Sequence, residues 1–258
     1  MASLPSNQTL DILAIAAHRD DVEQTCGGTL LKAAQRGQRT GILDLTQGEM
    51  GTRGTAQDRA READDAAKIL GVSWRRALDI PDGRVENTWE NRLKVAGVIR
   101  ETRPRAVILP YWKGRHPDHY TASILGYEAC FLAGLAKLEV RDQGSEASTP
   151  RKEVSAAAPH RPFKIVYATL YYDIRPTFVV DISDQFEQKM ASILAYKSQF
   201  GDQDAGKDIF PAHDEIRARV ESMARFYGAL GGVSHGEPFL QKEVGLVDDL
   251  LAIPVKSI

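Results

Sequence analysis

The segment Ile12-Leu13-Ala14-Ile15-Ala16-Ala17-His18-Arg19-Asp20-Asp21-Val22-Glu23 places a run of apolar residues directly before a cluster of polar ones. Its first six residues have the length and continuity of a strand that is buried on both faces of a parallel sheet. The residues that follow favour a helix with an apolar side and a glycine, Gly37, at its end. The polar cluster therefore lies at the carboxyl end of a strand, where open α/β sheets bind their ligands.

The same alternation of short apolar runs and amphipathic stretches continues along the chain. It predicts strands at residues 11–17, 40–45, 76–80, 105–110, 164–171 and 177–181, and helices at residues 24–37, 56–70, 88–102, 120–137, 184–199 and 214–229. Such alternation is typical of an α/β, Rossmann-like fold, in which helices cover both faces of a mostly parallel sheet. The short segment Tyr171–Thr177 indicates that the last two predicted strands pair as an antiparallel hairpin.

Length and composition fit a single domain over residues 1–258, with 43% hydrophobic and 26% charged residues. The formal net charge of −2 gives no indication of a nucleic-acid partner. The chain has no apolar run long enough to span a bilayer and no signal-peptide pattern at its start, so we expect a cytoplasmic protein without a membrane partner. Cys26 and Cys130 are expected to be buried thiols rather than a disulfide. The polar segment 139–161 predicts a flexible surface loop.

Three side chains of the first polar cluster have the chemistry of a hydrolytic metal site. His18 and Asp21 lie three residues apart across a strand-to-helix turn, and imidazole with carboxylate suits zinc. Asp20 would remain free to act as the general base of metal-assisted hydrolysis. Acidic residues at a helix start also cap the helix and complement its dipole, so this cluster alone leaves both interpretations open.

A second polar cluster, His116-Pro117-Asp118-His119, follows another predicted buried strand. Catalytic zinc sites usually have three protein ligands and keep a fourth position open for water. His18, Asp21 and one of the histidines His116 and His119 would complete such a set and leave the other histidine for the substrate. Three of the six histidines fall in these two strand-end segments, which favours a shared metal site over chance placement.

The two clusters together resemble the paired signature of the LmbE-like (PIG-L type) zinc-dependent deacetylases, which remove acetyl groups from N-acetylglucosamine-containing substrates. Within that family the chain is most similar to the deacetylase of bacillithiol biosynthesis. The stretches Asp44–Gly54, Val179–Ser183 and Ala195–Phe200 support the resemblance, which extends over nearly the whole chain. The family signature has proline where this chain has Arg19, so the turn lacks the restraint of a proline ring.

The resemblance implies a role for each residue of the two clusters. It makes His18, Asp21 and His119 the metal ligands, Asp20 the general base, His116 the protonated group that stabilises the oxyanion or assists the leaving amine, and Asp118 an orienting residue. The expected cofactor is Zn²⁺, although Fe²⁺ accepts the same ligand set. The expected partners are a small amino-sugar substrate and further copies of the chain, since similar deacetylases often form homohexamers.

Three residues near the clusters are candidates for substrate contacts. Arg53 lies in a glycine-rich loop that we expect to be a mobile wall of the crevice, and its guanidinium would bind the malate carboxylates of a bacillithiol-type substrate. Arg19 could bind an anionic substrate or point into solvent. Trp112 could stack on a sugar ring or pack beneath the strand end.

The predicted function is therefore deacetylation of N-acetylglucosaminyl malate in bacillithiol biosynthesis. Three alternatives stay open. The chain could deacetylate chitooligosaccharides or another N-acetylated amino sugar, or it could bind metal with activity weakened by Arg19. The third is a Rossmann-like nucleotide-dependent enzyme, although the first strand is followed by His18–Glu23 rather than by a glycine fingerprint.

Overall fold

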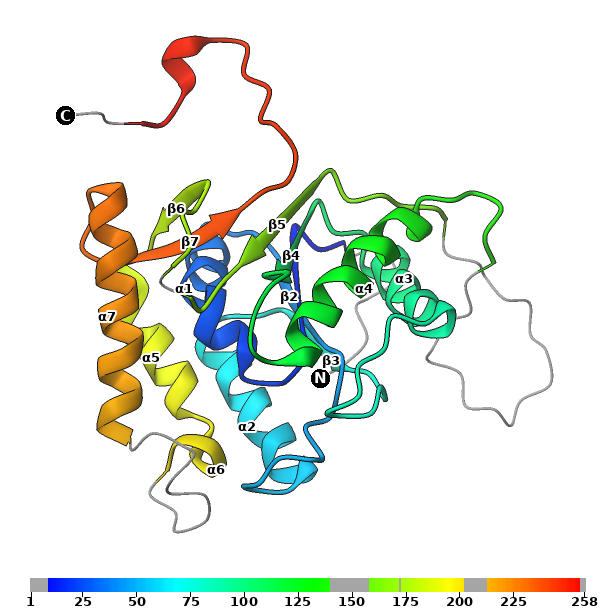
Figure 1. The fold of residues 1–258 in the computed structure, drawn as a ribbon, viewed down its shortest axis with the longest axis horizontal. Helices are drawn as coiled ribbons and strands as arrows, with labels where there is room; N and C mark the ends of the chain where they lie inside the picture. Colours follow the sequence, from blue (N-terminus) through cyan, green and yellow to red (C-terminus); the bar gives the residue numbers. More distant parts are fainter. Residues whose placement is uncertain (1–8, 140–157, 172, 202–212, 256–258) are drawn as a thin grey trace.

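The computed structural model describes residues 9–139, 158–171, 173–201 and 213–255 (Figure 1). Within these residues the chain forms a seven-stranded sheet with the order β3-β2-β1-β4-β5-β7-β6. The strands are Ile12–Ala16 (β1), Thr40–Asp44 (β2), Trp74–Ala77 (β3), Ala106–Pro110 (β4), Lys164–Ala168 (β5), Phe178–Asp181 (β6) and Gly236–Leu240 (β7). Most of the predicted loop 139–161 lies outside the described residues.

The helices follow the strands in alternation, as the sequence predicts. They are Asp21–Gln35 (α1), Ala56–Ile69 (α2), Trp89–Thr102 (α3), Pro117–Ala133 (α4), Phe186–Leu194 (α5), Lys197–Phe200 (α6) and His213–Gly231 (α7), with 3₁₀ turns at Ser183–Gln185 and Leu250–Ala252. Helix α1 begins three residues before the predicted start, so Asp21 lies in its first turn. Among the described helices, none is both long enough and apolar enough to cross a bilayer.

Five neighbouring strands, β3, β2, β1, β4 and β5, run parallel to one another. Their carboxyl ends therefore meet at one edge of the sheet, and the polar segments after β1, β3 and β4 all begin there. This arrangement confirms the predicted α/β fold with a mostly parallel sheet.

Alternate residues of the central strand β1 pack on opposite faces of the sheet. Leu13 and Ile15 belong to a core that includes Cys130 of α4, whereas Ala14 and Ala16 pack with Cys26 and other residues of α1. Figure 1 shows α3 and α4 together on one side of the strands and α1, α2 and α5 on the other. Both cysteines are buried and free, as the sequence predicts.

The expected antiparallel hairpin between the fifth and sixth strands is wrong. The unpredicted strand β7 lies between β5 and β6 and pairs antiparallel with both. Its sequence, with Gly236, Glu237 and Pro238, lacks the apolar alternation of a strand. Glu237 is nevertheless buried. Its carboxylate tolerates burial because it accepts hydrogen bonds from the backbone of α1 and forms an ion pair with Lys189. Long-range polar contacts therefore stabilise β7 where local pattern does not.

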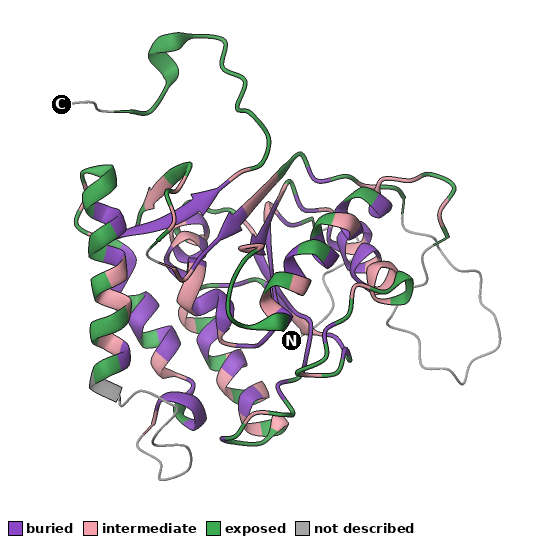
Figure 2. Cartoon of the chain, viewed as in Figure 1, coloured by how far each residue is buried: buried purple, intermediate pink, exposed green. Residues whose placement is uncertain are grey.

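Residues 241–255, which we call the C-terminal arm, leave the body of the protein after β7 (Figure 1). Figure 2 shows the arm almost wholly exposed, in contrast with the buried strands from which it departs. At its root, Lys242 Nζ lies 5.0 Å from the ring centre of Trp112, 4.6 Å from that of Tyr127 and 4.8 Å from that of Tyr167. These cation–π contacts fix the start of the arm against the body.

Candidate metal centre

The three ligands implied by the sequence come together at the carboxyl ends of β1 and β4. His18 Nδ1 lies 3.2 Å from His119 Nε2 and 3.4 Å from Asp21 Oδ2, and His119 Nε2 lies 3.2 Å from Asp21 Oδ1. Ligand atoms about 2.0 to 2.1 Å from a tetrahedral ion stand about 3.3 to 3.4 Å from one another. The three donor groups therefore lie at the separations of neighbouring zinc ligands, with His18 facing Oδ2 of Asp21 and His119 facing Oδ1.

The two ring nitrogens of His18 face different neighbours. Nδ1 faces His119 and Asp21, whereas Nε2 lies 3.0 Å from Asp82 Oδ1 and 3.4 Å from Asp118 Oδ2. Two sets of donor atoms lie within 4.8 Å of one another, namely His18, His116 and His119, and His18, Asp82 and Asp118. A metal-bound histidine usually donates its other ring N–H to a carboxylate. This pattern favours Nδ1 as the metal-binding atom and Nε2 as the donor to Asp82.

The centre has a strongly negative potential. Burial opposes protonation of His18, but hydrogen bonds to Asp118, Asp21 and Asp82 outweigh it and raise the pKa of His18 to about 12. Burial likewise opposes protonation of His119, yet Asp21 raises its pKa above the ordinary value. Imidazoles hold protons this firmly only where carboxylates crowd them. A divalent cation would neutralise the same carboxylates, so the charge of the site fits a metal ion.

Asp118 orients His18 rather than the two histidines on either side of it in the sequence. Its buried carboxylate accepts hydrogen bonds from the backbone N–H groups of Gly83, at 2.8 Å, and Val85, at 3.1 Å, and also approaches His18. Burial opposes ionisation of Asp118, but His18 and these N–H groups lower its pKa. The carboxylate is therefore held in its charged form, facing the His18 ring.

Asp82 is the orienting residue that the sequence patterns did not single out. It follows β3, whose carboxyl end lies at the same edge as those of β1 and β4. The sequence signal was available, since Pro81-Asp82-Gly83 is an acidic turn after a predicted strand. This turn indicates a site residue only once β3 is known to lie beside β2 in the same parallel sheet.

Replacing Asp82 by alanine is expected to weaken metal binding about 10- to 100-fold, because His18 Nε2 loses its nearest carboxylate acceptor. Titration of the apo protein with zinc in competition with a chelator measures the change in Kd. The matched control is Asp79→Ala on the same segment, since Asp79 is exposed and pairs only with Lys94 among the described residues. Equal zinc affinity in the Asp82→Ala and Asp79→Ala proteins would contradict an orienting role for Asp82.

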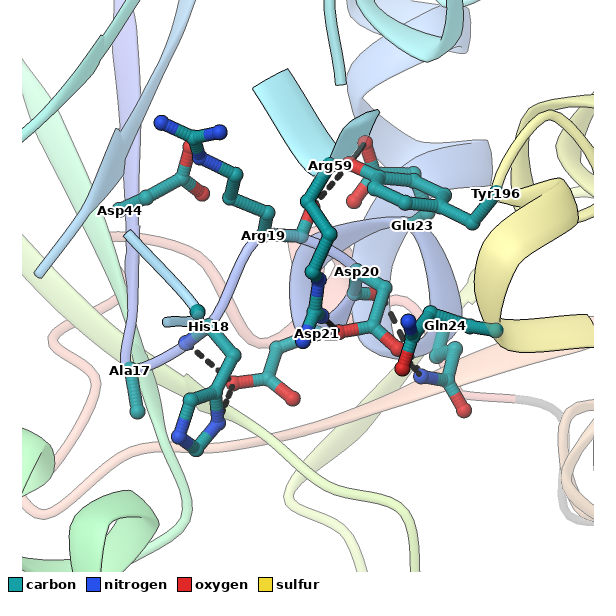
Figure 3. A network of polar contacts seen from close by, with 12 residues as sticks. Ala17, His18, Arg19, Asp20, Asp21, Glu23, Gln24, Asp44, Arg59 and Tyr196 are labelled. Atoms are coloured by element: carbon teal, nitrogen blue, oxygen red, sulfur yellow. Dashed lines mark hydrogen bonds and ion pairs between the residues drawn. The ribbon is translucent and has the colours of Figure 1, made fainter. Parts of the chain in front are cut away.

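Asp20 lies beside the three ligands but faces different partners (Figure 3). Its Oδ1 accepts a hydrogen bond from the guanidinium of Arg59 at 2.9 Å, and its Oδ2 accepts one from Gln24 Nε2 at 3.2 Å. Arg59 is a buried residue of α2 and was not among the predicted site residues. These two contacts fix the orientation of the Asp20 carboxylate next to the ligand Asp21, where a general base is required.

Arg19 neither points into solvent nor reaches the metal site, in contrast to both expectations from the sequence. Its side chain is buried, extends toward Asp44 (Figure 3) and donates a hydrogen bond to the carbonyl of Ala56 at 2.9 Å. The carbonyl of Arg19 accepts hydrogen bonds from the guanidinium of Arg75 and the hydroxyl of Tyr196. These contacts restrain the turn in the absence of a proline ring.

Arg75 and Tyr196 belong to a buried ionic network beneath this turn. Arg75 binds both carboxylate oxygens of Asp44, at 2.8 and 2.9 Å, and Glu23 Oε1 at 2.6 Å. Burial opposes the charge of Arg75, but Asp44 and Glu23 outweigh it and raise its pKa. Tyr196 Oη lies 3.0 Å from Glu23 Oε1, so this buried tyrosine joins the same network. Loss of one partner from such a buried pair costs about 3 to 5 kcal/mol.

His116 lies at the exposed mouth of the site. Its Nδ1 accepts a hydrogen bond from the Asp118 N–H at 3.2 Å, and its ring stacks on that of His119 with centres 4.7 Å apart. Burial and the neighbouring His18 and His119 lower the pKa of His116, which opposes the protonated state that the family resemblance implies for it. A small cavity of about 30 Å³, lined by Asp21, Thr25, His119, Lys113 and Tyr171 together with apolar residues of β1, α1 and β4, lies beside the centre. The exposed His116 does not line this cavity, so a substrate would meet it from the solvent side of the centre.

The side chains of Arg53 and Trp112 contact other residues of the protein rather than lying open to a substrate. Arg53 is buried and donates a hydrogen bond to the carbonyl of Gln199, whose side chain donates back to the carbonyl of Arg53. The glycine-rich loop is thus tied to α6 instead of forming a free wall. The ring of Trp112 meets that of Tyr167 edge to face, with centres 4.7 Å apart, and Lys242 lies over the Trp112 ring. The substrate contacts expected for both residues receive no support from their placement.

The chain is similar to several known proteins. The model of the family "GlcNAc-PI de-N-acetylase" (PIG-L) matches residues 13–130. Diacetylchitobiose deacetylase of Thermococcus kodakarensis is 32% identical over 244 residues, which cover 90% of this chain and 83% of the relative. The conserved protein TT1542 of Thermus thermophilus has a solved structure with a TM-score of 0.77 and 38% identity, covering 93% of this chain and 98% of that chain.

One relative is named for a different reaction. The 4-oxalmesaconate hydratase of Pseudomonas putida is 28% identical over 200 residues, which cover 72% of this chain and 73% of the relative. The family model covers β1 to β4, and the similarity to the Thermococcus deacetylase and to the Thermus structure extends over nine tenths or more of this chain. The chain therefore belongs to the PIG-L family of de-N-acetylases.

Proposed function

We propose that this protein removes the acetyl group from an N-acetylglucosaminyl substrate by metal-assisted hydrolysis of the acetamide. The observation that carries the proposal is the convergence of His18, Asp21 and His119 donor atoms at 3.2 to 3.4 Å, with the carboxylate of Asp20 held just outside them. Membership of a de-N-acetylase family and the name of the Thermococcus relative support the same reaction class.

The side chains of the site divide the chemistry among them. A divalent cation held by His18, Asp21 and His119 would supply Lewis-acid activation of water and of the acetamide carbonyl. Asp20 accepts a proton from the attacking water, while Arg59 keeps its carboxylate in position. His116 stabilises the developing oxyanion and gives a proton to the departing nitrogen. Addition of water and cleavage of the C–N bond release acetate and the free amine.

We propose zinc as the ion. A set of two imidazole nitrogens and one carboxylate matches catalytic zinc sites, and the distances between the donor groups suit tetrahedral geometry. Ferrous iron accepts the same donor types and is the alternative. Metal analysis of protein purified without added metal distinguishes the two ions.

Two N-acetylglucosaminyl compounds are proposed as substrates, namely N,N'-diacetylchitobiose and N-acetylglucosaminyl malate. The name of the Thermococcus relative supports the first. The second depended on a contact between Arg53 and malate, and the burial of Arg53 weakens that support. We therefore place diacetylchitobiose first.

A substrate panel with zinc-reconstituted protein tests the proposed function. We expect a free-amine assay to detect product from diacetylchitobiose at a rate at least about 10-fold above that from N-acetylglucosaminyl malate. A difference of about 1 to 3 kcal/mol in how a pocket binds two substrates changes their relative rates by about 10- to 200-fold. N-acetylglucosamine serves as the minimal substrate. Release of amine from none of the three by zinc-loaded protein would overturn the proposal. Hydration of 4-oxalmesaconate under the same conditions would instead assign the reaction named for the Pseudomonas relative.

A further inference from the structure

The segment that carries His116 makes few polar contacts with the rest of the described protein. It runs from the end of β4 to the start of α4, and residues 113–116 are all exposed. Within residues 112–115, the N–H of Arg115 is the only group that forms a hydrogen bond with another described residue. The acceptor of that bond therefore has a large share in fixing the segment and the imidazole that follows it.

That acceptor is the hydroxyl of Tyr171, a half-buried residue in the segment after β5. The Arg115 nitrogen lies 3.0 Å from Tyr171 Oη. Strand β5 pairs in parallel with β4 (Figure 1), so the segments after the two strands leave the same edge of the sheet. Tyr171 also lines the small cavity beside the metal centre, together with His119. Its hydroxyl thus joins the segment after β4 to the segment after β5, next to the site.

Glycine at position 114 allows the tyrosine to approach this segment closely. A Cβ atom at Gly114 would lie 2.4 Å from Tyr171 Oη and 3.0 Å from Cε2 and Cζ of the ring. Such distances are too short for atoms in contact, so a larger residue at this position would push the segment and the ring apart. The fit of Gly114 against the ring edge is a second contact that sets the distance between them.

The backbone of Tyr171 is itself anchored to the body of the protein. Tyr227 of α7 is completely buried, and its hydroxyl donates a hydrogen bond that is shared between the carbonyls of Tyr171 and Ile174. The N–H of Tyr171 donates to Oγ1 of the buried Thr169 at 3.2 Å. A side chain whose backbone is fixed in this way can hold an exposed neighbouring segment in one position.

We propose that Tyr171 is a positioning residue for His116. Its hydroxyl and the edge of its ring hold Gly114 and Arg115 so that the His116 imidazole meets the substrate acetamide at the metal centre. The inference rests on the proposed function, in which His116 stabilises the oxyanion and gives a proton to the departing nitrogen. Tyr171 acts through His116 and needs no contact with the reacting atoms.

Kinetics of Tyr171→Phe in two backgrounds test this role. In the otherwise unchanged protein we expect kcat on diacetylchitobiose to fall about 10-fold, as loss of one hydrogen bond permits, while KM and zinc content change little. In the His116→Ala background the same substitution should leave kcat unchanged within about twofold, because residues that act as a unit are not additive. Tyr120→Phe is the matched control and should leave kcat unchanged, since the hydroxyl of this exposed residue of α4 has no hydrogen bond to a described residue.

Gly114→Ala tests the second contact. It should lower kcat about 100-fold, since a displacement of about 1 Å can have that effect, and it should change kcat little once His116 is replaced by alanine.

Two outcomes would overturn the role of Tyr171 and leave the proposed function intact. The first is an equal loss of kcat with and without His116, because it would show that Tyr171 contacts the substrate itself or only supports the fold. The second is a wild-type rate in both the Tyr171→Phe and the Gly114→Ala proteins. Failure of the zinc-loaded wild-type protein to release amine would instead overturn the proposed function, and this role with it.

Discussion

Alanine in place of Asp20 is expected to lower kcat by about 10²- to 10⁴-fold while the protein keeps its metal, because it removes the general base but none of the three ligands. The structure supports this separation of roles, since the Asp20 carboxylate contacts Arg59 and Gln24 whereas His18, Asp21 and His119 face one another. Steady-state kinetics on zinc-reconstituted protein, with metal content measured on the same sample, check the result.

Arg19→Pro is the matched comparison in the same turn. It restores the residue found in the family signature and removes a side chain that contacts Ala56 rather than the metal site. The backbone carbonyl of residue 19 remains available to Arg75 and Tyr196. We therefore expect a smaller change in kcat than for Asp20→Ala, and the reverse order would show that the turn, rather than the base, limits catalysis.

Alanine in place of His119 is expected to abolish activity by removing the metal. The His119 Nε2 atom lies 3.2 Å from donor atoms of both His18 and Asp21, so its loss leaves an incomplete ligand set. Zinc content after dialysis should fall to less than roughly one tenth of the wild-type value, because a metal that is bound through fewer ligands dissociates readily. Elemental analysis measures the content directly.

His116→Ala is the control for that measurement. His116 is exposed and stacks on His119, and we place it on the substrate side of the site. The variant should keep its zinc while kcat falls about 10²- to 10⁴-fold, as for loss of a general acid. If His116→Ala lost the metal and His119→Ala kept it, His116 would be the ligand and His119 the residue that acts on the substrate.

The first half of the metal centre is predictable because it is local. His18, Asp20 and Asp21 follow one buried strand, and chain direction alone places them at the ligand-binding edge of a parallel sheet. The segment His116–His119 follows β4, the strand paired with β1, so the same rule brings it to that edge. Pattern and family resemblance could therefore predict that these side chains come together, and their role as metal ligands stays a prediction.

Residues that act through tertiary contacts could not be found in this way. Arg59 reaches Asp20 from the first turn of α2, where an arginine on a polar helix looks like any solvated side chain. Arg19 appears in the sequence as an exposed charge, yet it is buried because Ala56 supplies a carbonyl from another element. Strand β7 was missed for the same reason, since Glu237 is satisfied only by partners distant in sequence.

The hydrogen bonds to the carbonyl of Arg19 bear on which residues position 19 tolerates. Arg75 and Tyr196 hold the backbone of the turn through a group that every amino acid has, so the turn does not depend on the side chain at this position. Substitutions of Arg19 are therefore expected to be tolerated better when Arg75 and Tyr196 are both present than when either has been replaced.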